Sequence, residues 1–204
     1  MTDFDAAART WDDDPTKVRR ARRVADAIVA RGLPLGRMTV LEYGCGTGLL
    51  GFALAPHVAH VTMADTSPGM LAVVRDKIAA SGARNVEARH IDLVEGHMLY
   101  ERYDLVCTLM TLHHIADTDE ILRSFHDVLT PGGTVCICDL DKEDGAFHGE
   151  GFTGHNGFDR EDLARRLTQA GFVSPDFTTV DEITKQTERG PRTFPLFLAV
   201  ARKA

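Results

Sequence analysis

The amino-acid sequence predicts a doubly wound α/β fold with a seven-stranded, mostly parallel sheet and an antiparallel C-terminal edge strand. Three observations carry this prediction. Short apolar runs alternate with segments of helical periodicity through most of the 204-residue chain, as in parallel βαβ units. Glycines or acidic residues stand where several of these runs end. The last two strand-like segments have no helix between them, so we expect them to pair antiparallel.

The composition suits one globular domain. Hydrophobic residues make up 44% of the chain and charged residues 26%, which is enough for an ordinary core. The net charge of −7 argues against a broad nucleic-acid surface, which needs clustered lysine and arginine. No apolar run resembles a signal peptide or a membrane span, so we expect a cytoplasmic protein without a membrane partner. The four cysteines form no Cys-x-x-Cys motif and are expected to be small buried hydrophobes.

The first helix is predicted to begin at Asp14 and Pro15, a capping residue followed by a proline in the first turn. Gly32 and Pro34 are expected to end it. Apolar residues recur between them with helical spacing, at Val18, Ala21, Val24, Ala25 and Ile28.

We interpret residues 1–35 as a helical cap or lid on a main domain at residues 36–204. The basic run at 17–23 keeps the helical periodicity, so it is expected to be the solvated face of the helix. Before the helix, Phe4 or Trp11 could cover a bound ligand, and Trp11 could equally pack the helix onto the domain.

The first half of the main domain contains three predicted strands, at residues 38–43, 60–65 and 85–93. A glycine-rich turn and a short helix to about residue 55 follow the first strand. A helix opened by Ser67 and Pro68 and ended by Gly82 follows the second. Asp65 and Asp92 stand at the exits of the second and third strands. Ligands of such sheets bind beyond the carboxyl ends of the strands, so both acids are candidate site residues.

The second half repeats the alternation. Strands are predicted at residues 103–112 and 134–140, and the helix between them is marked by Ile121, Leu122, Phe125, Val128 and Leu129. A glycine-rich, irregular segment follows at 141–157. Asp159 and Asp162 then resemble a capping box that opens a helix ending at Gly171. The final strands are expected around residues 177–183 and 194–202.

The stretch "VLEYGCGTGLLG" at residues 40–51 can be read in two registers. Gly44, Gly46 and Gly48 spell G-x-G-x-G, whereas Gly46, Gly48 and Gly51 spell the dinucleotide fingerprint G-x-G-x-x-G. Asp65 follows at a spacing that suits the ribose of any adenosine cofactor, so it does not separate the registers.

Two acids decide between the registers. Glu42 stands two residues before Gly44, where its carboxylate would repel a pyrophosphate and attract an ammonium or sulfonium group. Asp92 is well placed to accept a hydrogen bond from an adenine amino group. Both favour the first register and a methyl-transfer cofactor.

Together with "LTPGG" and the terminal "FPLFLAVARK", these residues resemble the class I S-adenosylmethionine-dependent methyltransferases over residues 36–202. The resemblance implies a Rossmann-like methyltransferase fold, S-adenosyl-L-methionine as cofactor and S-adenosyl-L-homocysteine as product. The cofactor-binding residues that it implies are Glu42, Tyr43, Gly44, Cys45, Gly46, Gly48, Asp65, Thr66, Met70, Asp92, Leu93 and Leu109.

Within that set the resemblance implies a division of labour. Glu42 and the glycine turn would hold the methionine part, Asp65 the ribose, and Asp92 with Leu93 the adenine. Thr66 takes the place beside adenine but is smaller than the usual apolar residue, so Met70 is expected to supply part of that wall. Gly51 is then a small residue that lets the helix approach the sheet.

His113 and His114 follow the fourth strand, in the loop that lies beside the reactive methyl group in the family. Either histidine could accept a proton from the substrate, since the ordinary pKa of the side chain is near 6.5. The competing interpretation is that they only pack and hydrogen-bond beneath the cofactor.

The segment from Asp139 to Gly157 reads either as a substrate-contacting lid or as an ordinary solvated loop. Combining His113 and His148 with Asp139 or Asp141 would give a metal site, but the spacing matches no metal-ligand motif. We therefore expect no metal.

The expected function is S-adenosylmethionine-dependent methyl transfer to a nitrogen or oxygen of a small-molecule acceptor by in-line displacement. Such a reaction mainly needs alignment and exclusion of water. The expected partners are that acceptor and at most a second copy of the chain, as a monomer or homodimer, with no nucleic acid. The alternative is a non-catalytic S-adenosylmethionine-binding sensor or partner subunit.

Overall fold

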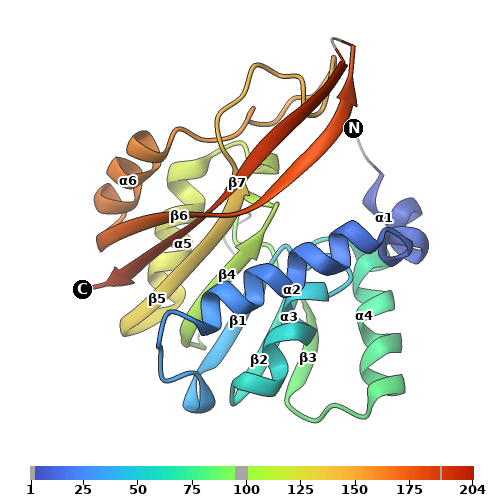
Figure 1. The fold of residues 1–204 in the computed structure, drawn as a ribbon. Helices are drawn as coiled ribbons and strands as arrows, with labels where there is room; N and C mark the ends of the chain where they lie inside the picture. The colour runs from blue at the N-terminus through green and yellow to red at the C-terminus, as the bar shows by residue number, and fades with distance from the viewer. Residues whose placement is uncertain (1–2, 95–100, 189) are drawn as a thin grey trace.

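A computed structural model describes residues 3–94, 101–188 and 190–204, so residues 1 and 2 of the expected cap lie outside it. The described chain forms one sheet of seven strands in the order β3-β2-β1-β4-β5-β7-β6 (Figure 1). The strands are β1 Thr39–Tyr43, β2 His60–Asp65, β3 Val86–His90, β4 Tyr103–Leu109, β5 Leu129–Leu140, β6 Phe172–Thr187 and β7 Gly190–Lys203. Strands β1 to β5 pair in parallel, and β7 is antiparallel to both β5 and β6. The predicted fold class is therefore confirmed, with the antiparallel strand inserted between β5 and β6.

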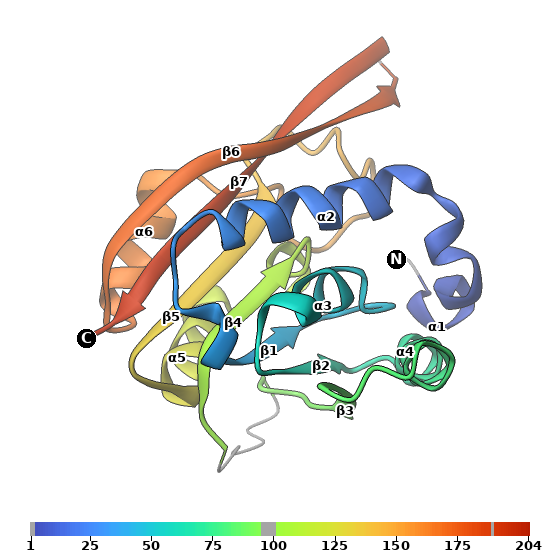
Figure 2. The ribbon, with the colours of Figure 1, turned by 60° about the horizontal axis from the view of Figure 1, so that its bottom comes forward.

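Helices cover both faces of the sheet (Figure 2). They are α1 Phe4–Ala7, α2 Pro15–Val29, α3 Leu49–Leu54, α4 Pro68–Ser81, α5 Thr118–Val128 and α6 Arg160–Gln169, with short 3-10 turns η1 Ala8–Asp13, η2 Leu35–Arg37, η3 Ala55–His57 and η4 Leu112–His114. Helices α2, α3 and α4 share one apolar cluster with the sheet, and α5 and α6 share the other. The right-handed crossovers of a doubly wound sheet produce this two-sided arrangement.

Local signals set the starts of three helices. The Asp14 carboxylate accepts a hydrogen bond from the Thr16 N–H at the start of α2, and Pro15 occupies the first turn, as the sequence predicts. Ser67 caps α4 and Asp159 caps α6 in the same way. Each such cap stabilises the helix by about 1 kcal/mol, because it satisfies a backbone N–H that the helix leaves unpaired.

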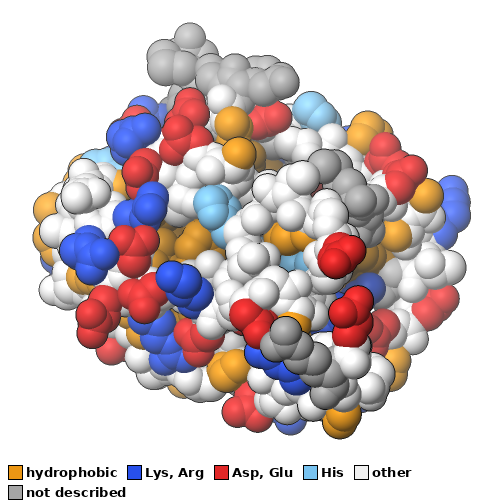
Figure 3. All heavy atoms as spheres, turned by 90° about the horizontal axis from the view of Figure 1, so that it is seen from above, with side chains coloured by type: hydrophobic (Ala, Val, Ile, Leu, Met, Phe, Trp, Pro, Cys, Tyr) orange, Lys and Arg blue, Asp and Glu red, His pale blue; other side chains and the backbone are white. Residues whose placement is uncertain are grey.

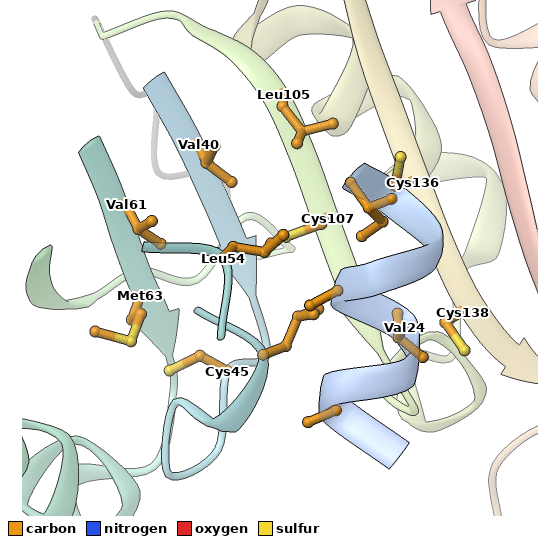
Figure 4. Close-up of a cluster of buried hydrophobic side chains, with 14 of the residues drawn as sticks. Val24, Val40, Cys45, Leu54, Val61, Met63, Leu105, Cys107, Cys136 and Cys138 are labelled. Atoms are coloured by element: carbon orange, nitrogen blue, oxygen red, sulfur yellow. The ribbon is translucent and has the colours of Figure 1, made fainter. Parts of the chain in front are cut away.

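The core under α2 contains all four cysteine side chains of the protein. Figure 4 shows Val24 on α2 facing Cys136 and Cys138 of β5, with Cys107 of β4 nearby. All four cysteines of the chain are buried and free of disulfide bonds, which confirms that they act as small hydrophobes. Four side chains of α2 are buried in this core, so the helix of the expected cap packs closely on the rest of the chain.

The basic run on α2 has two faces. Arg19, Arg22 and Arg23 are exposed, as expected for a solvated face. Lys17 and Arg20 instead turn toward the cavity described below, and the Nε of Arg20 lies 3.5 Å from a carboxylate oxygen of Asp181 in β6. The predicted solvated face therefore holds for only part of the run.

The C-terminal hairpin is longer than the predicted strands. Strand β5 pairs with β7 only up to the Leu140–Leu196 pair, whereas β6 and β7 continue to pair as far as Thr187 and Gly190. The end of the hairpin therefore projects beyond the rest of the sheet (Figure 1). Among the described residues, no helix combines the length and hydrophobicity needed to cross a membrane.

Candidate functional site

A cavity of about 860 Å³ lies at the carboxyl ends of the central strands. Tyr43 at the end of β1, Asp65 at the end of β2 and Leu109 at the end of β4 all line it. This is the place where open α/β sheets bind ligands, and the volume falls within the usual range for small-molecule sites.

Ten of the twelve predicted cofactor residues line this cavity: Glu42, Tyr43, Gly44, Cys45, Gly46, Asp65, Thr66, Met70, Asp92 and Leu109. Gly48 and Leu93 do not. Gly48 precedes α3 with a φ of 80°, and an added Cβ would lie 2.7 Å from the sulfur of Met63. Leu93 is buried and donates its N–H to the Tyr43 hydroxyl oxygen over 3.2 Å. Both residues therefore support the wall of the cavity from behind.

The glycine turn packs closely against neighbouring side chains at some positions, where only glycine fits, and faces the cavity at others. A Cβ at Gly44, whose φ is 68°, would lie 2.1 Å from Cγ2 of Thr111. At Gly46 the nearest atoms to such a Cβ are 3.9 Å away, so its backbone is accessible to a ligand. At Gly51 a Cβ would lie 2.5 Å from a carboxyl oxygen of Glu42, so this glycine lets α3 approach the sheet, as expected.

Glu42 is a buried acid at the base of the glycine turn. Its side chain accepts a hydrogen bond from the Gly51 N–H over 2.9 Å and is 2% exposed. Burial raises its pKa to about 8, and the nearby Asp65 adds to the shift. Without a cation beside it, the carboxyl group is therefore mostly protonated at neutral pH. A neighbouring positive charge would favour the ionised form.

The other two acids, Asp65 and Asp92, stabilise turns at the cavity by accepting backbone hydrogen bonds. Asp65 accepts hydrogen bonds from the Gly46 N–H over 2.7 Å and from the Ser67 N–H over 2.9 Å. Asp92 accepts one from the Val94 N–H over 2.9 Å.

These hydrogen bonds bear on the choice of cofactor. A dinucleotide pyrophosphate binds backbone N–H groups of the glycine turn and the helix that follows it. Here carboxyl groups of the protein already accept from Gly46 and Gly51, and a pyrophosphate would meet those acids. An ammonium group and ribose hydroxyls fit the same acceptors, so the residues present fit S-adenosylmethionine.

His113, which follows β4, is fixed by Asp139 of the neighbouring strand β5. Its Nδ1 lies 2.6 Å from one carboxylate oxygen of Asp139, and its backbone N–H donates to the other over 3.2 Å. Both side chains are buried, with 1% and 0% exposed. Because Nδ1 is engaged, Nε2 is the nitrogen that His113 can offer to a ligand.

His114 follows directly and has a different environment. Its ring centroid lies 4.1 Å from that of His113, and it retains solvent contact while protein atoms crowd its other side. This partial desolvation and the neighbouring His113 lower its pKa to about 4. At pH 7 it is neutral and a weak base.

The irregular segment after β5 contributes Phe147 and His148 to the cavity wall. His148 stacks on Phe152 with ring centroids 3.8 Å apart, and its pKa is also lowered to about 4, mainly by burial. Other candidates of this segment lie away from the cavity. Asp141 binds Arg160 of α6 with atoms 2.7 Å apart, and His155 Nε2 lies 2.9 Å from the Ile115 carbonyl oxygen.

The N-terminal segment closes another side. Phe4 and Trp11 line the cavity, and the Phe4 ring lies 5.3 Å from that of His114. Asp12 accepts a hydrogen bond from the Thr47 hydroxyl over 2.5 Å and forms an ion pair with Lys77. Asp5 accepts hydrogen bonds from Ser67 and Gly69 at the start of α4.

Several residues of the site are not predicted from the sequence. They are Asp5, Asp12, Lys17, Arg20, Thr111 and Lys185. Asp139 was one of several polar residues of its segment, although an acid inside the apolar run "TVCICDL" is a usable signal, because a buried carboxylate needs partners. Lys185 reaches the cavity from β6, and no local pattern indicates it.

Comparisons with known proteins agree with this geometry. The model of the family described as "Methyltransferase domain" matches residues 40–133. An uncharacterized methyltransferase of Mycobacterium tuberculosis is 33% identical over 112 residues, which is 55% of each chain. A ubiquinone biosynthesis O-methyltransferase of Pseudomonas syringae pv. tomato is 31% identical over 151 residues, covering 71% of this chain and 63% of that protein.

Among solved structures, an S-adenosylmethionine-dependent methyltransferase from Aquifex aeolicus superposes with a TM-score of 0.66 and 17% identity, covering 94% of this chain and 99% of the other. This likeness concerns the fold. In sequence, the matched part spans about half the length of the mycobacterial relative.

Proposed function

We propose that this chain, which belongs to the class I S-adenosylmethionine-dependent methyltransferase family, transfers the cofactor's methyl group to a nitrogen or oxygen of a small-molecule acceptor. The observation that supports this most is the division of the cavity. Three lining acids, Glu42, Asp65 and Asp92, stand near the ends of β1, β2 and β3, and three lining histidines, His113, His114 and His148, follow β4 and β5. By the strand order β3-β2-β1-β4-β5, the acids and the histidines therefore line different halves of the cavity. We call these the cofactor half and the acceptor half.

In the cofactor half we assign the following roles. Glu42 and the turn formed by Tyr43, Gly44, Cys45, Gly46 and Gly48 hold the methionine part of S-adenosylmethionine. Asp65 accepts from the ribose hydroxyls. Asp92 accepts from the adenine amino group, with Thr66, Met70 and Leu109 beside the ring and Leu93 behind it. The bound cofactor supplies a methyl group on a positively charged sulfur, which is a good leaving group.

In the acceptor half the chain has to orient the nucleophile and exclude water. Phe4 and Trp11 of the N-terminal segment cover the cavity and serve the second task. Asp139 orients His113 so that Nε2 is presented to a ligand, and the weak base His114 lies beside it. These two histidines are the groups we expect to handle the proton of a hydroxyl or ammonium acceptor.

Three observations favour a small acceptor. The cavity volume of about 860 Å³ is usual for small-molecule sites, and the net charge of −7 disfavours nucleic acid. On the face seen in Figure 3, acidic and basic side chains are interspersed, with histidines visible between them. We propose that the protein acts as a monomer or homodimer. The Pseudomonas relative is named as an O-methyltransferase, which supports oxygen as one nucleophile.

The test is turnover on a panel of small amines and hydroxyl compounds, with S-adenosylhomocysteine formation measured by mass spectrometry. We expect product with at least one class of acceptor. Calorimetry with S-adenosylhomocysteine and NADH checks the cofactor: binding of NADH alone would overturn the proposal. Tight binding of S-adenosylhomocysteine without turnover on any acceptor would favour the non-catalytic sensor.

A further inference from the structure

Three histidines from distant parts of the sequence meet on one wall of the cavity. His113 and His114 belong to the turn η4 after β4, and His148 belongs to the irregular segment after β5. Their ligand nitrogens all lie within 4.8 Å of one another. The ring centroid of His148 lies 5.0 Å from that of His113 and 5.6 Å from that of His114.

One of these nitrogens is buried without a partner. Nε2 of His148 has no hydrogen-bond partner among the described residues, although it is shielded from solvent. A buried polar atom left in this state costs free energy unless a ligand satisfies it. Aromatic stacking on Phe152 explains the position of the ring but leaves Nε2 unsatisfied.

A second observation concerns His113. Its Nδ1 is held by the buried carboxylate of Asp139 at 2.6 Å, so Nε2 is left for ligation. Metal-ligating histidines commonly have such a carboxylate on the other ring nitrogen, because it fixes the tautomer and the ring orientation. The pair is therefore arranged as a ligand and its supporting acid.

We propose that His113, His114 and His148 bind a divalent transition metal, with Zn²⁺ as the expected ion, and that its fourth coordination position faces the cavity. Three neutral imidazoles with one open position form the ligand set of a catalytic zinc site, whereas Mg²⁺ and Ca²⁺ require oxygen ligands. This departs from the expectation of no metal, which rested on spacing alone.

The required movement is small. Tetrahedral coordination with Zn–N bonds of about 2.0–2.1 Å places ligand nitrogens roughly 3.3 Å apart. His113 is fixed by Asp139, so His114 and His148 have to rotate toward it. His114 is exposed and His148 partly so, which gives both rings room to turn.

The metal would also assist the proposed methyl transfer. This catalytic effect rests on the proposed function, whereas the metal site itself does not. A hydroxyl acceptor in the fourth position would release its proton to water more readily, because the metal stabilises the resulting oxyanion. With the metal bound, His113 and His114 act as ligands, and this release to water replaces the proton transfer assigned to them in the metal-free site. The oxygen lone pair then forms the bond to the methyl carbon. The carbon–sulfur bond breaks with its electron pair passing to sulfur, which leaves neutral S-adenosylhomocysteine.

The experiment is metal titration of the chelator-treated full chain, without acceptor. Co²⁺ binding is followed by visible absorption, and Zn²⁺ is added to displace it. We expect one equivalent of Co²⁺ with a tetrahedral spectrum and its displacement by Zn²⁺. His148→Ala and Asp139→Asn should lower the affinity on the order of 10- to 100-fold, and the exposed His57→Ala should not.

Circular dichroism and S-adenosylhomocysteine affinity serve as folding checks, since His148→Ala should leave both unchanged. Absence of a Co²⁺ spectrum, or equal metal affinity in wild type and His148→Ala, would overturn the site. The two proposals fail separately. Metal binding without turnover on any acceptor counts against methyl transfer, whereas turnover by a chain that binds no metal counts against the site.

Discussion

The two halves of the cavity are built in different ways. In the cofactor half, each acid stands near the end of a strand or just beyond it. Glu42 accepts from a backbone N–H of α3, Asp65 from one in the turn after β1, and Asp92 from one in its own turn. In the acceptor half, His113 depends on Asp139, which lies 26 residues away, and His148 comes from a further segment. The cofactor half is built from the ends of sheet strands and the turns beside them. The acceptor half depends also on the course of the segment after β5.

This difference has a physical consequence. The carboxyl-to-backbone hydrogen bonds of the cofactor half join the ends of paired parallel strands to the turn and helix beside them, so this half is preorganised with the sheet. The acceptor half needs the segment after β5 to fold back, and loops vary without disturbing the sheet. The two halves should therefore respond separately to mutation, and the predictions below test that separation.

The largest effect is expected at Glu42. Its pKa is about 8 in the folded chain against an ordinary value of 4.5, so the folded state holds the proton more tightly between these pH values. The free energy of unfolding therefore falls as pH rises from 4.5 to 8. Glu42→Gln removes this fall and should be more stable than wild type at pH 9, by up to roughly 5 kcal/mol. It should also bind S-adenosylhomocysteine more weakly, because the amide cannot attract the ammonium group.

Urea unfolding at pH 5, 7 and 9 measures the first effect and calorimetry the second. Glu161→Gln, at an exposed site on α6, is the matched control and should show neither. A stability difference that does not change with pH would contradict the assigned pKa.

The next effect is at Asp65. Asp65→Ala should weaken S-adenosylhomocysteine binding by more than about tenfold, since hydrogen bonds to charged groups contribute about 1.5–3 kcal/mol each. Loss of its bonds to Gly46 and Ser67 also loosens the glycine turn. Metal affinity in the acceptor half should stay within twofold. Calorimetry measures both, with the exposed Asp76→Ala as control, and an unchanged S-adenosylhomocysteine affinity would refute the role of Asp65.

A smaller effect is expected at the N-terminal segment, which borders both halves. Asp12→Ala removes the contacts with Thr47 and Lys77 and should speed S-adenosylhomocysteine release by about three- to tenfold, because a partly exposed pair contributes about 1 kcal/mol. Trp11, the single tryptophan, lines the cavity and provides a fluorescence signal for stopped-flow measurement. Asp13→Ala is the neighbouring control, and equal release rates would show that the contact does not hold the segment down.

The smallest effect on cofactor affinity is expected at His114. His114→Ala should change the dissociation constant of S-adenosylhomocysteine by less than about twofold, which is within roughly 0.4 kcal/mol. Turnover should fall, because the side chain belongs to the acceptor half. A large loss of cofactor affinity would favour the packing interpretation and would break the proposed separation of the halves.

Much of the fold could be predicted because its signals are local. Asp14 with Pro15 and Asp159 with Asp162 mark helix starts through side chains that bond within three residues. The run from 60 to 65 became β2 without a change of bounds. The ends of β6 and β7 were underestimated, because their outer parts are polar and their pairing depends on each other rather than on a buried face.

The cofactor half could likewise be predicted, since Glu42, Asp65 and Asp92 follow strands in a fixed order. The acceptor half could not. The sequence suggests His113, but nothing near His148 shows that its ring comes within 5.0 Å of that of His113. Lys185 is one charged residue in a polar strand, and only the tilt of the hairpin brings it to Phe147.

Because of that hairpin, substitutions that alter the rim of the cavity can be distinct from substitutions that alter the sheet. Lys185 pairs with Arg192 beyond the last contact between β5 and β7, in a part of the hairpin that the parallel sheet does not need. Substitutions there can reshape the rim of the cavity while the sheet and its glycine turn remain as they are. Related proteins could thus differ in acceptor through substitutions in the outer part of the hairpin, while the residues that bind the cofactor stay the same.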